Sequence, residues 1–101
     1  MATASLSISA DTGEGIREYV AIALDVLDEL GIRYELTSMA TNMEGDVATI
    51  CRALTIIHER CHGHGAARVG SLLKIDDRID IAQTLASKVQ HVQAYRSRIT
   101  P

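Results

Sequence analysis

The segment between Tyr34 and Gly45 holds the densest group of side chains that could bind a ligand. The group consists of Thr37, Thr41, Asn42 and Glu44. A carboxylate with neighbouring hydroxyls and amides can hydrogen-bond an amine-bearing heterocycle, more strongly when the ligand nitrogen is protonated. Glu44 has an equally good structural explanation, because an acidic residue is favoured at the N-terminus of a helix. The residue types leave both roles open, and one glutamate can serve both.

A second group of charged side chains follows the last predicted strand and consists of Asp76, Asp77, Arg78 and Asp80. Its carboxylates could bind a cation, and Arg78 could hold an anion. The alternative is a solvated strand end where aspartate and arginine pair on the surface, which contributes little stability. Residue types alone favour this surface pairing.

A third cluster contains the usual zinc ligands, at His58, Cys61, His62 and His64. Cys61 falls on the predicted apolar stripe of its helix, where a free cysteine behaves as a small hydrophobic residue. The histidines lie at a helix C-terminus, where a partly protonated imidazole is favoured. We therefore predict no metal site and no resident cofactor. Cys51 and Cys61 lie about 15 Å apart along one helix, so we expect reduced thiols.

The sequence contains no recognisable catalytic motif, neither a nucleophile elbow nor a glycine-rich phosphate loop. A binding protein is therefore the first functional hypothesis. The alternatives are a small enzyme that uses Glu44 or Asp76 as a general base, and a structural oligomerisation module.

Hydropathy periods predict the elements that position these side chains. Apolar residues alternate in the first segment, as in a strand with one buried face, and recur at helical spacing in three others. Asp46 is the expected N-cap of the second helix, and Gly31 is expected to end the first. The predicted elements are a turn over 11–15, strands over 3–10 and 67–76, an extended segment with a central bend over 32–44, helices over 16–30 and 46–62, and a third helix marked by Leu85, Val89, Val92, Tyr95 and Ile99.

This order predicts an α+β fold, a ferredoxin-like split β-α-β sandwich with an additional C-terminal helix. Two helices would cover one sheet face, and the third could cover part of the other, in its own subunit or in a neighbour's. With 101 residues, the chain is expected to form a single domain over 1–101.

Composition narrows the classes of partner. A net charge of −3 argues against general binding of nucleic acid. The chain has three tyrosines and no phenylalanine or tryptophan, so it has few aromatic side chains on which the bases of RNA could stack. No apolar run approaches the roughly 20 residues that span a bilayer, and no secretory signal precedes the first strand. We expect a cytoplasmic protein.

Several segments together resemble the MTH1187/YkoF-like family of thiamine-binding proteins, UPF0045, over most of residues 4–92. They are Glu18–Ala21, Gly31–Thr37, Met39–Thr41, Met43–Gly45, Arg68–Val69, Lys74–Arg78 with Asp80, and Lys88–Val89. One departure is Ala40, where the family has glycine. The resemblance implies a ferredoxin-like fold, binding of thiamine or its hydroxymethylpyrimidine moiety without chemistry, and a homodimer or homotetramer assembled through its sheets. Carried onto matching positions, it implies a ligand site at Thr41, Glu44, Asp76 and Arg78, to which the residue pattern adds Thr37.

Overall fold

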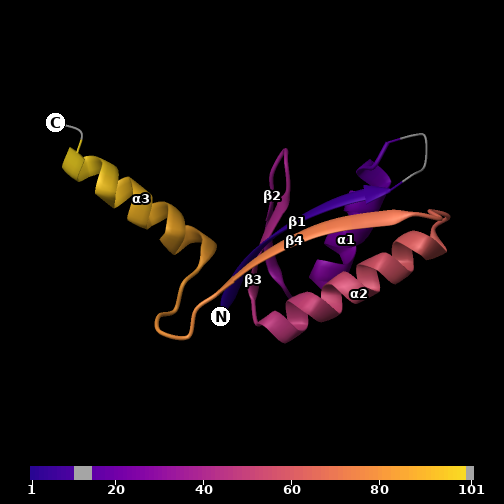
Figure 1. Cartoon of the computed structure of the whole chain (residues 1–101), viewed down its shortest axis with the longest axis horizontal. Helices are drawn as coiled ribbons and strands as arrows, with labels where there is room; N and C mark the ends of the chain where they lie inside the picture. Colours follow the sequence, from indigo (N-terminus) through magenta and orange to yellow (C-terminus); the bar gives the residue numbers. More distant parts are fainter. Residues whose placement is uncertain (11–14, 100–101) are drawn as a thin grey trace.

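The computed structural model describes residues 1–10 and 15–99, and Figure 1 shows how their elements are arranged. The predicted turn over 11–15 lies outside the described residues except for Gly15. In chain order the elements are β1 (Ala2–Ala10), α1 (Arg17–Glu29), β2 (Arg33–Leu36), β3 (Thr41–Gly45), α2 (Val47–Gly63), β4 (Val69–Asp77) and α3 (Leu85–Ile99). The predicted α+β fold, a ferredoxin-like split β-α-β sandwich with an extra C-terminal helix, is confirmed.

The four strands form one antiparallel sheet in the order β2-β3-β1-β4. Its register places Thr3 opposite Glu44 on one side and Asp76 on the other. These three side chains therefore share a sheet face, because directly opposed residues point the same way. Thr41 pairs with Leu6 and points to the other face, since strand side chains alternate.

The helix-covered face holds the core. The predicted apolar face of the first strand packs against α1 and α2, and the fully buried large side chains are all aliphatic or sulfur-containing. They are Leu27, Met43, Ile50, Ile57, Val26 and Cys61. Burial raises the pKa of the Cys61 thiol, so this group is held neutral inside the core.

Local signals set the helix ends as predicted. The Asp46 carboxylate accepts a hydrogen bond from the Thr49 backbone amide at 3.3 Å, which caps α2. Gly31 follows α1 with φ +67°, a left-handed conformation that favours glycine. At the hairpin bend, by contrast, Ala40 does not have a positive φ, because glycines are the only described residues that do. Ala40 therefore replaces the family's glycine there without backbone strain.

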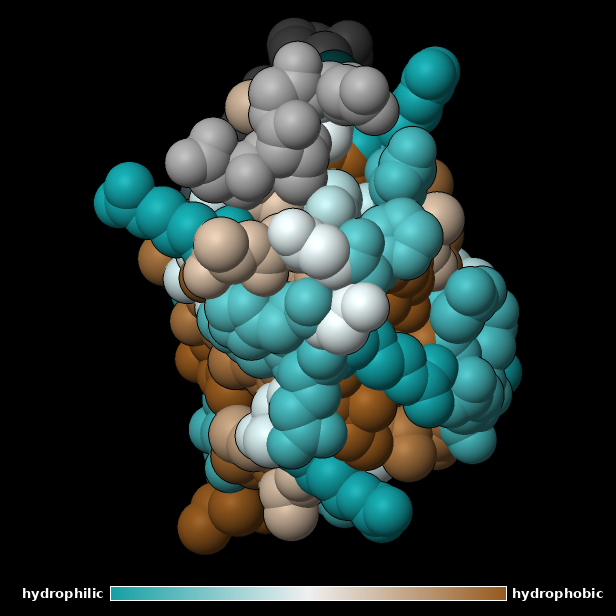
Figure 2. Space-filling view, turned by 90° about the vertical axis from the view of Figure 1, so that its right-hand side faces the viewer, coloured by the Kyte–Doolittle hydropathy of each residue, from teal (hydrophilic) through white to brown (hydrophobic). Residues whose placement is uncertain are grey.

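The open face of the sheet is mostly uncovered. α3 meets it only near its first turn and then projects away from the body (Figure 1). Seen from the end opposite α3, hydrophilic side chains predominate and apolar ones show between them (Figure 2). No helix among the described residues is both long and apolar enough to cross a membrane.

Candidate ligand-binding site

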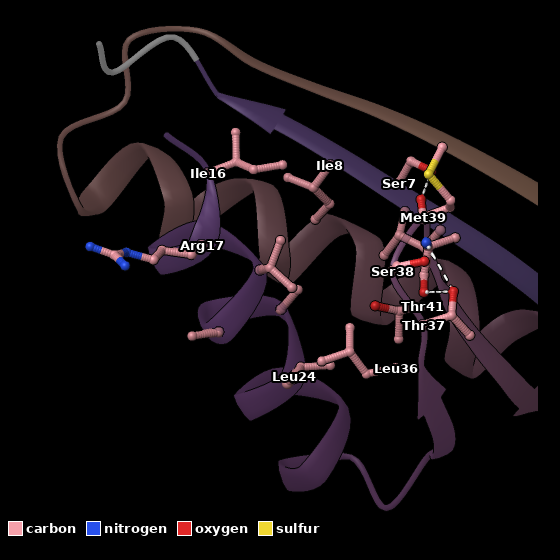
Figure 3. Close-up of a pocket in the computed structure, with 15 residues that line it drawn as sticks. Ser7, Ile8, Ile16, Arg17, Leu24, Leu36, Thr37, Ser38, Met39 and Thr41 are labelled. Atoms are coloured by element: carbon pink, nitrogen blue, oxygen red, sulfur yellow. Dashed lines mark hydrogen bonds between the residues drawn. The ribbon is translucent and has the colours of Figure 1, made fainter. Parts of the chain in front are cut away.

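The best-formed cavity lies on the helix-covered side, between the C-terminal half of β1, the first half of α1 and the β2–β3 hairpin (Figure 3). Its volume is about 440 Å³, within the range of small-molecule sites. Aliphatic side chains form most of its wall, and hairpin hydroxyls line one part of it. The residues used below are Ile8, Ile16, Leu24, Leu36, Thr37 and Thr41.

Thr41 supplies a hydroxyl with which a ligand in this cavity could form a hydrogen bond. The residue is only 5% exposed, yet its hydroxyl has no hydrogen-bond partner among the described residues. Its oxygen is not among the fully buried unpaired atoms of the described residues, so a ligand in the cavity can reach it and supply a hydrogen bond. The β3 register fixes its direction, because Thr41 lies opposite Leu6 in the core-facing row.

Thr37 shapes the same end of the cavity. Its hydroxyl donates to the Ala40 carbonyl at 2.7 Å and accepts from the Ala40 amide at 3.2 Å, and its own amide also donates to that carbonyl. These bonds close the hairpin tip. Ser7 donates to the Met39 carbonyl at 3.5 Å and ties the tip to β1. The position of Thr41 therefore depends on a hairpin tip that Thr37 closes and that Ser7 ties to β1.

Among the described residues that line the cavity, Arg17 is the one charged side chain, and it points away from the hydroxyls (Figure 3). The wall suits a flat, largely apolar ring with one hydrogen-bonding edge. It contains no carboxylate that would select a positively charged ring.

Glu44 and Asp76, two other predicted site residues, lie on the open face instead. The Glu44 carboxylate is buried, accepts a hydrogen bond from the Leu85 amide at 2.8 Å and lies 3.6 Å from the Arg33 guanidinium. Lys88 donates to Asp76 at 2.6 Å, and this hydrogen bond and positive charge lower the pKa of the Asp76 carboxyl. Both acids hold the first turns of α3.

A smaller cavity of about 280 Å³ lies between these turns of α3 and the sheet. Thr3 lines it, and its buried hydroxyl has no hydrogen-bond partner within residues 1–10 and 15–99. The cavity mixes acids and bases, including Glu35, Lys74 and Lys88. It lies on the opposite sheet face from Thr41.

Arg78 is separate from both cavities and pairs with Asp80, its Nε lying 2.9 Å from Asp80 Oδ1. This is the surface pairing that the residue types favoured, and it accounts for the lowered pKa of the Asp80 carboxyl. The five predicted site residues thus fall into three places. Thr37 and Thr41 meet at one cavity, while the ligand roles of Glu44, Asp76 and Arg78 stay predictions.

The histidine cluster has separate local partners. His58 lies 2.8 Å from the Ser71 hydroxyl, His62 2.8 Å from the Ala66 carbonyl and His64 3.0 Å from Glu18. Within residues 1–10 and 15–99, no three histidine, cysteine, aspartate or glutamate side chains are grouped as a metal site requires. Both cysteines are free, Cys51 at the surface and Cys61 in the core.

The apolar wall of the main cavity was missing from the sequence prediction. Ile8, Ile16 and Leu36 each follow a recognisable period, but that period reports burial and not the shape of a cavity. The cavity depends on where the hairpin tip lies relative to α1, a tertiary distance without a local signal.

Comparison with known proteins decides the family. A family model described as "Thiamine-binding protein" matches residues 4–93. The chain belongs to the thiamine-binding protein family. A relative named UPF0045 protein, from Methanothermobacter thermautotrophicus, is 35% identical over 96 residues, which cover 92% of this chain and 97% of that one. A Synechocystis relative, UPF0045 protein sll0230, is 34% identical over 83 residues, 82% of this chain and 69% of the relative.

Solved structures share the fold of this chain. The crystal structure of MJ1052 from Methanocaldococcus jannaschii superposes with a TM-score of 0.83 at 30% identity, over 91% of this chain and 95% of that chain. A Thermotoga maritima protein, described as a candidate in thiamine biosynthesis or salvage, gives a TM-score of 0.78 at 22% identity, over 90% and 97% of the two chains. At that identity the likeness concerns the fold alone.

Proposed function

We propose that this chain is a non-enzymatic binding protein that holds the pyrimidine ring of thiamine, or free hydroxymethylpyrimidine, in the cavity between α1 and the β2–β3 hairpin. The observation that carries this proposal is the Thr41 hydroxyl, which has no hydrogen-bond partner among the described residues and lies in a largely aliphatic wall. The family match to thiamine-binding proteins supplies the ligand class.

The chemistry of the two partners fits. A methyl-substituted aminopyrimidine is flat, has apolar faces and carries an amino group and ring nitrogens along its edge. Ile8 and Leu24 would cover its faces, while the Thr41 hydroxyl can donate to a ring nitrogen or accept from the amino group. The thiazolium of thiamine would remain outside the aliphatic wall, because burial of an unpaired cation is costly.

The enzyme alternative has less support. A general base at neutral pH needs a carboxyl whose pKa is raised, whereas Lys88 lowers the pKa of Asp76. Glu44 is engaged by the Leu85 amide and stands close to Arg33. Both acids are better explained by their contacts with α3 and its neighbourhood.

Two further features belong to the proposal. We place the protein in the cytoplasm, in keeping with its two free cysteines. We also propose that it self-associates, because several large apolar side chains are exposed on α3 and the open sheet face.

Calorimetric titration with thiamine, hydroxymethylpyrimidine and the thiazole half tests the ligand assignment. We expect the pyrimidine half to bind and to compete with thiamine, and the thiazole half to do neither. Binding of the thiazole half alone would refute the assignment. A matched thermal-shift series distinguishes weak binding from none, since only a ligand of the folded state raises the melting temperature.

A further inference from the structure

β1 is paired on both sides in its first half and on one side in its second half. Its pairing with β3 ends at Leu6 and Thr41, whereas its pairing with β4 continues as far as Ala10 and Val69. Residues 7–10 therefore have no strand beside them on the β3 side among the described residues, and we call them the free edge of β1. The unpaired N–H and C=O groups of such an edge pair readily with a further partner.

The hairpin tip does not pair with the free edge. No backbone hydrogen bond within the described parts of the chain joins residues 7–10 to the tip. The amide and carbonyl of Ala40, which come next in line with β3, bond to Thr37 instead. Among the described residues, only the Ser7 hydroxyl reaches across, to the Met39 carbonyl at 3.5 Å. The hairpin thus satisfies its own polar groups and leaves those of β1 available.

The free edge borders the main cavity. Ser7 and Ile8 both line it, beside the hairpin tip and across from the first half of α1 (Figure 3). Backbone groups of successive strand residues point alternately to the two sides of a strand. One of these two residues therefore directs both its N–H and its C=O to the side that β3 does not cover. Ile8 is only 8% exposed, so a ligand would pair with this edge largely out of water, where a hydrogen bond is stronger.

The chemistry of a strand edge matches one side of an aminopyrimidine. A strand residue offers a donor and an acceptor side by side, its N–H and its C=O. A 4-aminopyrimidine offers the complement, a ring nitrogen that accepts and an adjacent amino group that donates. A thiazolium ring carries no such pair. The match therefore concerns the pyrimidine half of thiamine and not the thiazole half.

The free edge also lies within reach of Thr41. Thr41 stands opposite Leu6, at the last pair of the β1–β3 ladder, and lines the same cavity. A strand rises about 3.3 Å per residue, so Ser7 and Ile8 follow about 3 and 7 Å beyond this pair. One substituted six-membered ring spans that distance, and it can contact the free edge and the Thr41 hydroxyl together.

We propose that the free edge of β1 at Ser7 and Ile8 binds the pyrimidine as a neighbouring strand would. A backbone N–H donates to the ring nitrogen, and a backbone C=O accepts from the amino group. The ring then continues the sheet, with one face toward the aliphatic side chains of α1. The backbone, together with Thr41, is thus the part of the site that selects 4-aminopyrimidines. This inference rests on the proposed function and names the groups that recognise the ligand.

Amide hydrogen exchange of the full chain tests the contact. In the free protein, we expect one of the Ser7 and Ile8 amides to exchange slowly, because it bonds to β4, and the other to exchange faster. Saturating hydroxymethylpyrimidine should slow the faster amide at least tenfold. Binding of this ligand without slower exchange at either amide would overturn the proposal.

An analogue with a methyl group in place of the amino group tests what the free edge recognises. It keeps the shape of the ring and removes the donor, so a carbonyl of the free edge is left without a partner. We expect its affinity for the wild type to be lower by about fivefold or more. The loss should persist in Thr41→Val, because the backbone groups are the same there. A loss that disappears in Thr41→Val would assign the amino group to the Thr41 hydroxyl and overturn the role of the free edge.

The outcomes separate this inference from the proposed function. If hydroxymethylpyrimidine gives neither heat in calorimetry nor a thermal shift, the ligand assignment is wrong and the role of the free edge is wrong with it. If it binds while the exchange of the Ser7 and Ile8 amides stays the same, the ligand assignment stands and only the role of the free edge is wrong. Circular dichroism checks that Thr41→Val keeps its fold.

Discussion

Thr41→Val is the sharpest perturbation of the proposed ligand site. Valine keeps the β-branched shape of threonine, which suits a strand, and replaces the hydroxyl by a methyl group. In the free protein this hydroxyl has no hydrogen-bond partner among the described residues, and the residue is 5% exposed. The substitution therefore removes a bond that exists only when ligand is present.

The expected magnitude follows from one neutral hydrogen bond. Its net contribution is about 0.5–1.5 kcal/mol, which corresponds to a loss of affinity of roughly 2–13-fold. The free energy of unfolding should stay within about 1 kcal/mol of the wild type or rise, since no protein hydrogen bond is lost. Binding and folding are thus expected to respond differently to the same substitution.

Calorimetric titration with hydroxymethylpyrimidine measures the affinity, and urea unfolding measures the stability. Thr55→Val is a matched control, because Thr55 lies on α2 outside the cavity and its hydroxyl donates to the Cys51 carbonyl. It should leave the affinity unchanged. The reasoning is refuted if Thr41→Val binds as tightly as the wild type.

Three further predictions concern the hairpin and α3. Ala40→Gly should lower the free energy of unfolding by about 0.4–1 kcal/mol, because glycine adds freedom to the unfolded chain and no positive φ at Ala40 requires it; greater stability in urea would contradict this. Glu44→Gln should speed hydrogen exchange at the Leu85 amide several-fold, because the charge that holds this amide is lost. It should leave the affinity for the pyrimidine unchanged. A weaker affinity in calorimetry would indicate that the ligand binds on the open face instead. The Asp76–Lys88 pair should hold α3 above the ordinary carboxyl pKa of 3.8 and release it as pH falls through the lowered folded-state pKa. Amide exchange in α3 followed against pH checks this, and Asp76→Asn should weaken the dependence.

The sequence predicted the elements well where a local signal fixes them. Alternation in the first strand reports its buried face, and Asp46 caps α2 because its carboxylate reaches an amide three residues on. Such signals depend on neighbours in the chain. They need no knowledge of the tertiary structure, and this is why the fold class followed from them.

The candidate site was harder to predict. Thr41 and Glu44 are three residues apart in one strand, so they point to opposite faces, and a single ligand site containing both would need one of them to turn. The sequence showed the alternation but not which face carries a cavity. That depends on the hairpin tip, which the Thr37 and Ser7 hydroxyls hold beside α1.

The contacts of α3 could not be predicted for a similar reason. Its apolar period indicates a buried stripe, whereas the structure leaves Val89, Val92 and Tyr95 exposed. An apolar helical period indicates that a helix face packs against a partner surface, but it does not indicate which chain supplies that surface.

Mapping of backbone amide shifts during titration with thiamine tests the central claim most directly. We predict that the largest changes fall on residues around the main cavity, such as Ile8, Leu36, Met39 and Thr41, and that hydroxymethylpyrimidine alone reproduces them. Changes confined to Thr3, Glu44 and Lys88 on the open face, or no changes at millimolar ligand, would contradict the proposed site.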